Sequence, residues 1–244
     1  MPIAPRSNED LLRAISYFGV LGQAEIKALA EASELRKTGR SGHLFKEGDR
    51  AEGLFIVRTG EFKITKGGGE QGDKEQREQI LYIARPGRPI VDGVRFDGGA
   101  YPAGAVAMRV SSAILIRNEV LAALGERKPA LFKALIDLRA HRSDRLVALV
   151  SDLSLRTVPA RLASFLWTLM CQREARGEEH LRMVRDLTTE TVAARLGTVR
   201  EEISRALASL ERAGALAVTP DLIEIVDPAK LEAIAFGREK TQRR

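Results

Sequence analysis

The residues of this 244-residue chain that could do chemistry gather near its carboxyl end, in the stretch TTETVAARLGTVREEISRAL. Four polar side chains there lie one, three and four positions apart, a spacing that places them on one face of a helix. They are Arg200, Glu201, Ser204 and Arg205. An arginine can donate two parallel hydrogen bonds to guanine O6 and N7, and a glutamate can accept one from the cytosine amino group. The four residues therefore predict a helix that reads base edges, G·C pairs among them, in the major groove of double-stranded DNA.

Short hydroxyl side chains surround this face, and such hydroxyls suit contacts with DNA phosphates. The predicted set consists of Thr188, Thr189, Thr198 and Ser204. Either Thr188 or Thr189 is also expected to cap the first helix of the stretch, because a threonine oxygen can accept a hydrogen bond from a first-turn amide. We expect capping to be the main role of that residue.

The apolar residues of the stretch specify the two helices that must position these side chains. Val192, Ala193 and Leu196 give the first helix one apolar face, and Gly197 permits the left-handed backbone of a tight turn. Apolar residues then recur every three or four positions over 199–210, which buries one side of the second helix against the first. The other side of the second helix is polar and would face outward.

The residues after the second helix predict a winged helix-turn-helix. Two short apolar segments, 215–218 and 222–226, flank Thr219-Pro220-Asp221 and are typical of two strands joined by a turn. The alternative is an ordinary amphipathic helix pair whose charges lie in solvent, with ion pairs such as Glu201 with Arg205. A small residue and a turn glycine at compatible positions favour the helix-turn-helix.

An antiparallel β domain is predicted over residues 44–116, where short apolar segments are punctuated by glycine. In GLFIVRTGEFKIT two apolar runs flank Gly60, which can supply the positive φ of a tight hairpin. The polar, glycine-rich residues 67–79 predict an exposed loop. The first thirty residues have helical spacing and predict a small helical preface to this domain.

Helices are predicted again after the β domain. Asn118 is expected to cap the first, and Pro129 to lie near the start of a long helix that runs to about Asp152. Apolar and small residues of the long helix alternate four and three positions apart, as two helices packed along a shared axis require. This seam consists of Ile136, Ala140, Ser143, Val147 and Val150. We expect it to form a homodimer interface; the alternative is that it covers the β domain of its own chain.

The expected fold class is α+β, with three parts. Residues 1–117 form a jelly-roll-like antiparallel β-roll sensor domain, 118–152 the connecting and dimerisation helices, and 153–244 the winged helix-turn-helix DNA-binding domain. A hinge is expected over 151–158, followed by a helix that begins near Pro159.

Composition excludes several other classes of protein. The net charge of +6 suits a polyanionic partner but is common in proteins generally. One cysteine, Cys171, excludes an internal disulfide and a four-cysteine iron–sulfur site, and we expect it to be a packed apolar residue. Three scattered histidines disfavour a metal site, and with it a cupin-type metal enzyme. No apolar run approaches the roughly 20 residues that a membrane span needs. We therefore expect a cytoplasmic protein that is not an enzyme.

The order of these parts resembles the superfamily of bacterial regulators that includes the cyclic-AMP receptor protein and the fumarate-nitrate reductase regulator. The resemblance spans nearly the whole chain and depends on LFKEGDRAEGLFIVRTGEFKI and LTTETVAARLGTVREEISRALASLERAGAL. It implies a homodimer joined through the long helix, a second helix that enters the major groove, and RNA polymerase as a further partner. By the same resemblance, Arg200, Glu201 and Arg205 match the base-reading positions.

The sensor half departs from the cyclic-nucleotide pattern, in which a glutamate binds the ribose and an Arg-Ser pair grips the phosphate. Asp92 is the nearest acid to the ribose position and is the candidate effector-binding residue, while Ala103 and Gly104 stand in place of Arg-Ser. A buried phosphate would lack its charge partner there, so cyclic AMP is not expected as the effector. Haem is an alternative cofactor, with Pro2 as an unusual iron ligand, but residues 84–88 offer no Cys or His partner.

The sequence thus predicts a homodimeric transcription factor that reads a palindromic operator and responds, if at all, to a small signal at the β domain. The alternative function is a small-molecule sensor whose C-terminal domain contacts protein instead of DNA.

Overall fold

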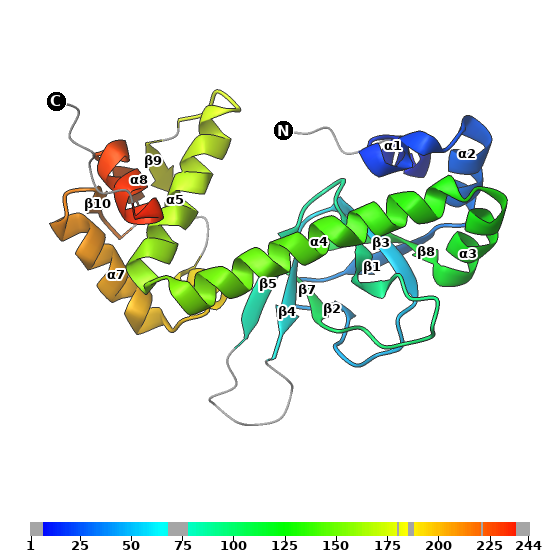
Figure 1. Cartoon of the computed structure of the whole chain (residues 1–244), viewed down its shortest axis with the longest axis horizontal. Helices are drawn as coiled ribbons and strands as arrows, with labels where there is room; N and C mark the ends of the chain where they lie inside the picture. The colour runs from blue at the N-terminus through cyan, green and yellow to red at the C-terminus, as the bar shows by residue number, and fades with distance from the viewer. Residues whose placement is uncertain (1–6, 68–77, 180, 185–187, 221, 238–244) are drawn as a thin grey trace. The chain divides into compact units, whose positions relative to one another are not determined.

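The computed structural model describes residues 7–67, 78–179, 181–184, 188–220 and 222–237 (Figure 1). The chain divides into two compact units, Met1–Val147 and Ala148–Arg244. The division falls inside one continuous helix, α4 (Ala130–Leu155). Each unit has its own apolar core.

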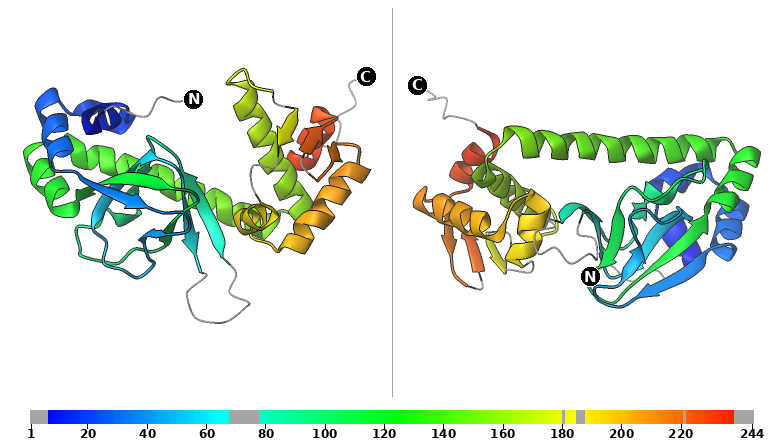
Figure 2. Two further views of the ribbon diagram at one scale, coloured as in Figure 1. Left: turned by 180° about the vertical axis from the view of Figure 1, so that it is seen from behind. Right: turned by 90° about the horizontal axis from the view of Figure 1, so that it is seen from below.

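The first unit is built on two four-stranded antiparallel sheets, as expected for a β-roll (Figures 1 and 2). One sheet has the order β1 (Glu34–Thr38), β8 (Ser111–Arg117), β3 (Gly53–Thr59) and β6 (Pro89–Ile90). The other has the order β2 (His43–Phe45), β7 (Gly104–Ala107), β4 (Phe62–Lys66) and β5 (Gln79–Ala84). The polar strand β1, with sequence ELRKT, lies outside the predicted β region and pairs with β8 along its whole length.

The central strands β3 and β8 are buried on both faces. Phe55 and Val57 of β3 point into the core between the sheets, whereas Leu54 and Ile56 belong to a second core on the other side. Helices cover that second side, and their residues complete its core. They are α1 (Asn8–Arg13), the 3₁₀ helix η1 (Ser16–Val20), α2 (Gln23–Glu31), α3 (Asn118–Arg127) and the first half of α4. The helical preface predicted from the first thirty residues is thereby confirmed over its described part.

The predicted hairpin around Gly60 is wrong, although its turn conformation is right. Gly60 has φ 75°, but β3 pairs with β6 and β8 while β4 pairs with β5 and β7. The turn therefore carries the chain from one sheet to the other. Because β3 is covered on both faces, it belongs to the sheet between the two cores. Most of the predicted loop 67–79 lies outside the described residues, and Gln79 already begins β5.

One prediction about the helices that follow is also wrong. Asn118 is the first residue of α3 and gives no side-chain cap; its buried amide donates to the carbonyl oxygens of Ala51 and Gly93 instead. The stretch 151–158, expected as a hinge, is helical except at residues 156–157, because α4 continues to Leu155 and α5 starts at Val158. The long helix itself is confirmed, three residues longer than expected.

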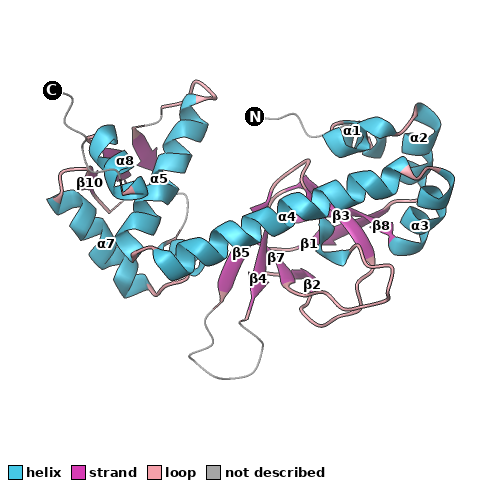
Figure 3. Ribbon diagram, in the orientation of Figure 1, coloured by secondary structure: helices cyan, strands magenta, loops and turns pink. Residues whose placement is uncertain are grey.

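The second unit packs around a single core. Figure 3 shows its helices and short strands. Its elements are α5 (Val158–Glu174), β9 (Arg182–Val184), α6 (Thr189–Leu196), α7 (Arg200–Arg212), β10 (Leu216–Val218), β11 (Leu222–Ile225) and α8 (Pro228–Phe236). The two predicted wing strands are confirmed as β10 and β11, and β9 adds a third strand beside β11. Cys171 is exposed, contrary to expectation, because the buried face of α5 passes through its neighbour Met170.

Replacement of Gly60 by alanine is expected to destabilise the first unit by about 2 kcal/mol, measured by urea unfolding. A left-handed backbone costs an L-residue roughly 1–2 kcal/mol. In addition, the new Cβ would lie 2.1 Å from Ser111 Oγ. Gly87→Ala is the matched control, since Gly87 has φ 78° but no atom within 4 Å of a Cβ. Equal losses for the two variants would contradict a steric role for the Ser111 contact.

Candidate nucleic-acid interface

The pair α6 and α7 has the geometry of a helix-turn-helix. Thr188 caps α6 by accepting a hydrogen bond from the Thr191 amide at 3.1 Å, which confirms one of the two expected capping residues. Gly197 then ends α6 in the left-handed conformation, at φ 62° and ψ 45°. Only Thr198 and Val199 separate this glycine from the first residue of α7. The short turn confirms the sequence prediction.

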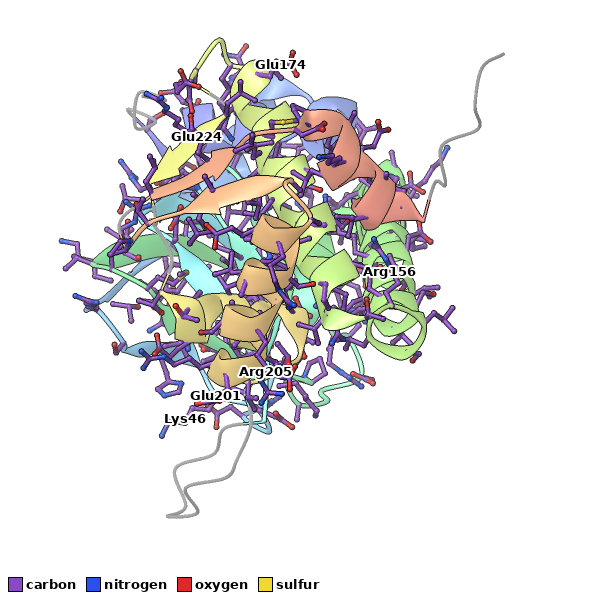
Figure 4. The ribbon with its side chains drawn as sticks, turned by 90° about the vertical axis from the view of Figure 1, so that its left-hand side faces the viewer. Lys46, Arg156, Glu174, Glu201, Arg205 and Glu224 are labelled. Atoms are coloured by element: carbon purple, nitrogen blue, oxygen red, sulfur yellow. The ribbon has the colours of Figure 1, made fainter. Side chains whose placement is uncertain are left out.

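The apolar face of α7 is buried, so its polar face is turned to solvent. Ile203, Ala206, Leu207 and Leu210 belong to the core of the second unit. Because a helix turns by about 100° per residue, the residues on the opposite side of α7 must then point outward. The predicted base-reading side chains are all exposed on α7: Arg200, Glu201, Ser204 and Arg205. Figure 4 shows Glu201 and Arg205 projecting from the same end of that helix.

Two glutamates that the sequence interpretation passed over hold the arginines of this face. Arg200 Nη1 lies 3.1 Å from Glu190 Oε1, and Arg205 Nη1 lies 2.7 Å from Glu202 Oε1. The pair of Glu201 with Arg205, which the alternative of an ordinary helix pair would form, is not the one present; Arg205 pairs with Glu202, three positions away. The arginine side chains are still 66% and 71% exposed. Ion pairs this open to water and salt are weak, so phosphates and base edges can displace them.

The carboxylate of Glu190 is further held at the start of α6. Its pKa lies below the usual value, chiefly because its own backbone amide donates a hydrogen bond to it, and then because of Thr188 and Arg200. An acidic residue in a first turn also interacts favourably with the helix dipole. Arg200 is thus tied to α6 as well as to α7, a link between the two helices that sequence spacing could not reveal.

The hydroxyl groups proposed for phosphate contacts differ in availability. Thr188 is engaged as the cap of α6, and Ser204 Oγ donates to the Arg200 carbonyl oxygen at 3.3 Å within α7. Thr189 and Thr198 are half-buried at the start of α6 and in the turn. All four lie around the exposed arginine face, and none lies in the apolar core.

A second candidate site lies in the first unit, around the predicted effector residue Asp92. This carboxylate is buried and accepts a 2.5 Å hydrogen bond at Oδ2 from the Tyr82 hydroxyl of β5. The pKa of Tyr82 lies well above its usual value, because burial and then the charge of Asp92 disfavour the phenolate. The hydroxyl therefore stays protonated and donates.

Arg142 of α4 completes this cluster. Its Nε lies 3.6 Å from Asp92 Oδ1, and its guanidinium carbon lies 4.0 Å from the centre of the Tyr82 ring. Nε, Nη1 and Nη2 are all buried without a hydrogen-bond partner among the described residues. A buried donor without a partner costs roughly 1–3 kcal/mol. Sequence reasoning missed Arg142 and Tyr82, because nothing in the helical or strand pattern marks them as neighbours.

The two positions that stand in place of the Arg-Ser pair carry no basic or hydroxyl side chain. Ala103 is buried, and Gly104 begins β7. A Cβ at Gly104 would make only ordinary contacts with the backbone of residues 45–47. Pro2, the suggested haem ligand, lies outside the described residues. Within the described ranges, no group of three His, Cys, Asp or Glu side chains could hold a metal ion.

The seam predicted along α4 is exposed over its whole length. Ile136, Val147 and Val150 are 65%, 67% and 62% exposed, which is unusual for large apolar side chains. Ala140 and Ser143 are exposed between them. The alternative in which this face covers the β domain is therefore wrong; the buried face of α4 consists of Leu131, Ala134, Leu135 and Leu138. None of the described helices is long and apolar enough to cross a membrane.

Comparison with known proteins agrees with this arrangement along the chain. A family model of the cyclic nucleotide-binding domain matches residues 36–128, and one of the Crp-like helix-turn-helix domain matches residues 160–234. Among solved structures, FixK2 from Bradyrhizobium japonicum aligns with a TM-score of 0.66 at 20% identity, over 83% of this chain and 96% of its own. The regulator CLP from Xanthomonas campestris aligns with a TM-score of 0.68 at 20% identity, over 84% of this chain and 100% of its own.

Curated relatives extend the agreement to the sequence. The transcriptional activator protein anr of Pseudomonas aeruginosa is 28% identical over 222 residues, or 87% of this chain and 86% of that protein. The fumarate and nitrate reduction regulatory protein of Vibrio cholerae is 30% identical over 222 residues, or 88% of this chain and 84% of that protein. At this identity over most of both proteins, and with a helix-turn-helix where the family model requires one, the chain belongs to the CRP/FNR family of DNA-binding transcription regulators.

Proposed function

We propose that this regulator acts as a homodimer that reads a palindromic operator with one copy of α7 in each of two major-groove segments. The observation that carries this proposal is the exposed face of α7, where Arg200, Glu201 and Arg205 project together. Two such helices on one side of the duplex require half-sites about one helical turn, roughly 34 Å, apart. The arginines would contact guanine and the glutamate cytosine.

The hydroxyl groups around this face would fix the register of the protein on the duplex. Thr189 and Thr198, with Ser204 after a rotamer change, are suited to phosphate oxygens, and the capped amino end of α6 offers backbone amides to the same groups. Thr188 would contribute mainly by holding that end in place. Contacts of this kind position a protein without reading sequence.

The exposed seam of α4 is suited to a second copy of the same helix. Its large apolar residues alternate with Ala140 and Ser143, which would let the two helix backbones approach closely. Burying an apolar side chain contributes roughly 1.5–3 kcal/mol, and each seam residue is buried twice in a symmetric pair. We accordingly assign 118–152 as the connecting and dimerisation segment between the sensor (1–117) and DNA-binding (153–244) domains.

The remaining assignments follow from this role. A regulator of bacterial promoters works in the cytoplasm beside RNA polymerase, which we propose as a further partner. Regulation needs no catalysis by the chain itself. The first unit would supply a signal by binding a ligand with different affinity in the DNA-competent and incompetent states.

Arg205→Ala is expected to weaken binding to the specific operator by about 1–3 kcal/mol, or roughly 5- to 150-fold, because the variant loses a bidentate contact with guanine. Fluorescence anisotropy with a labelled duplex at fixed salt measures this. Arg212→Ala removes the same charge from the other end of α7 and should lose far less. Wild-type affinity for the first variant would instead favour a C-terminal domain that contacts protein.

Val147→Asp is expected to convert the dimer largely to monomer, because it would bury two charges, one from each chain, within the seam. Sedimentation velocity over a concentration series measures the dissociation constant. Val110 is 79% exposed on the β-roll, so Val110→Asp is the control and should leave the dimer intact. A dimer that persists in the Val147 variant would show that α4 is not the interface.

Cyclic AMP and cyclic GMP are expected to give no saturable binding in isothermal titration calorimetry at micromolar concentrations. Ala103 and Gly104 offer no guanidinium or hydroxyl to a cyclic phosphate. Saturable micromolar binding of either nucleotide would overturn this expectation.

A further inference from the structure

Arg142 is a largely buried cation, and the hydrogen-bonding capacity of its three buried guanidinium nitrogens is unused. A guanidinium is always charged and carries five N–H donors, yet none of its three nitrogens has a partner among the described residues. The neighbouring carboxylate of Asp92 is 3.6 Å from Nε, beyond a good hydrogen bond, and its other oxygen is taken by the Tyr82 hydroxyl. The Tyr82 ring offers Arg142 its face and no acceptor atom. Buried charges are normally paired and hydrogen-bonded, so this one is incomplete.

Positive charge dominates around the cluster. Arg145 lies one turn further along α4 and is exposed. One turn before Arg142, Arg139 donates to the carbonyl oxygen of Val94 at 3.0 Å, so this side of α4 follows the segment that contains Asp92. Arg142 itself faces a single carboxylate, that of Asp92. The Arg142 guanidinium therefore still lacks a negatively charged partner with several acceptor oxygens.

We propose that the Tyr82–Asp92–Arg142 cluster is an anion site, in which a small carboxylate or phosphate ligand pairs with the Arg142 guanidinium. Carboxylate and phosphate are the two groups whose paired oxygens match the guanidinium fork. The cation comes from α4, not from the sheet positions Ala103 and Gly104, where the cyclic-nucleotide pattern has its Arg-Ser pair. A regulatory effect of the anion on DNA binding rests on the proposed function, whereas binding of the anion to the cluster does not.

Entry of the ligand into the cluster would require a movement of Tyr82 or of α4. The three nitrogens have almost no exposed surface, so an anion reaches them only when the Tyr82 ring turns away or α4 shifts on the β-roll. The ligand would therefore bind one arrangement of α4 better than the other, which is the condition for a signal. Val147 of the exposed seam lies on the same helix, five positions after Arg142.

The test titrates the full-length protein with sodium phosphate and, separately, sodium succinate by isothermal calorimetry, with chloride keeping the ionic strength constant. We expect saturable binding of at least one of the two, at one site per chain. Arg142→Gln should weaken it at least tenfold, whereas Lys133→Gln, an exposed charge on the same helix, should not change it. Which anion binds more tightly distinguishes a phosphate from a carboxylate ligand.

Asp92→Asn provides an independent test, because it keeps Arg142 and removes the competing carboxylate. It should tighten anion binding at least threefold, and the anion should restore any loss in melting temperature; Asp137→Asn on the exposed side of α4 is the control. If the cluster is only a structural ion pair, the Asp92 variant melts lower and no anion restores it.

Three results would overturn the proposal. The first is that neither anion gives saturable heat with the wild-type protein, and the second is that Arg142→Gln binds the anion as tightly as the wild type. The third is that Asp92→Asn neither binds the anion more tightly nor is stabilised by it. If Arg142→Gln fails to fold, the comparison of Asp92→Asn with its control Asp137→Asn decides whether the cluster binds anions. Operator binding is measured separately, so anion binding without DNA binding would contradict only the proposed function.

Discussion

The left-handed backbone at Gly197 is the constraint on which the exposed polar face of α7 depends. It ends α6 and allows α7 to begin three residues later, so that both helices can bury apolar faces in one core. Once Ile203 and Leu210 are fixed in that core, helical geometry leaves Arg200 and Arg205 no position except in solvent. The exposure of this surface is therefore a consequence of packing. Nothing in the charged residues themselves is needed to orient it.

The first unit depends in a similar way on a sheet that is buried on both faces. Strands β3 and β8 supply one set of side chains to the core between the sheets and the alternate set to the core beneath the helices. This arrangement fixes the first half of α4 against the β-roll through Leu131, Leu135 and Leu138. It thereby also fixes Arg142, one turn beyond Leu138, beside Tyr82 and Asp92.

Helix α4 connects three features on which the proposed function depends. Its buried face packs on the β-roll, its arginines approach the segment around Asp92, and its exposed seam carries Ile136, Val147 and Val150. The helix is continuous across the division between the two compact units and ends at Leu155, three residues beyond the expected end.

The sequence by itself determined the local structure and much of the exposed site. Helical and alternating periods located the β-roll, the long helix and the helix-turn-helix, because these patterns depend on which faces are buried. The exposure of Arg200, Glu201, Ser204 and Arg205 followed from the same periodicity. Only the tertiary structure decided which strands pair, and it moved β3 and β4 into different sheets where the sequence suggested one hairpin. It likewise decided the partners of charged groups. The pairs Glu190–Arg200, Glu202–Arg205 and Asp92–Arg142 join side chains through space, and periodicity reports burial but not which surfaces meet.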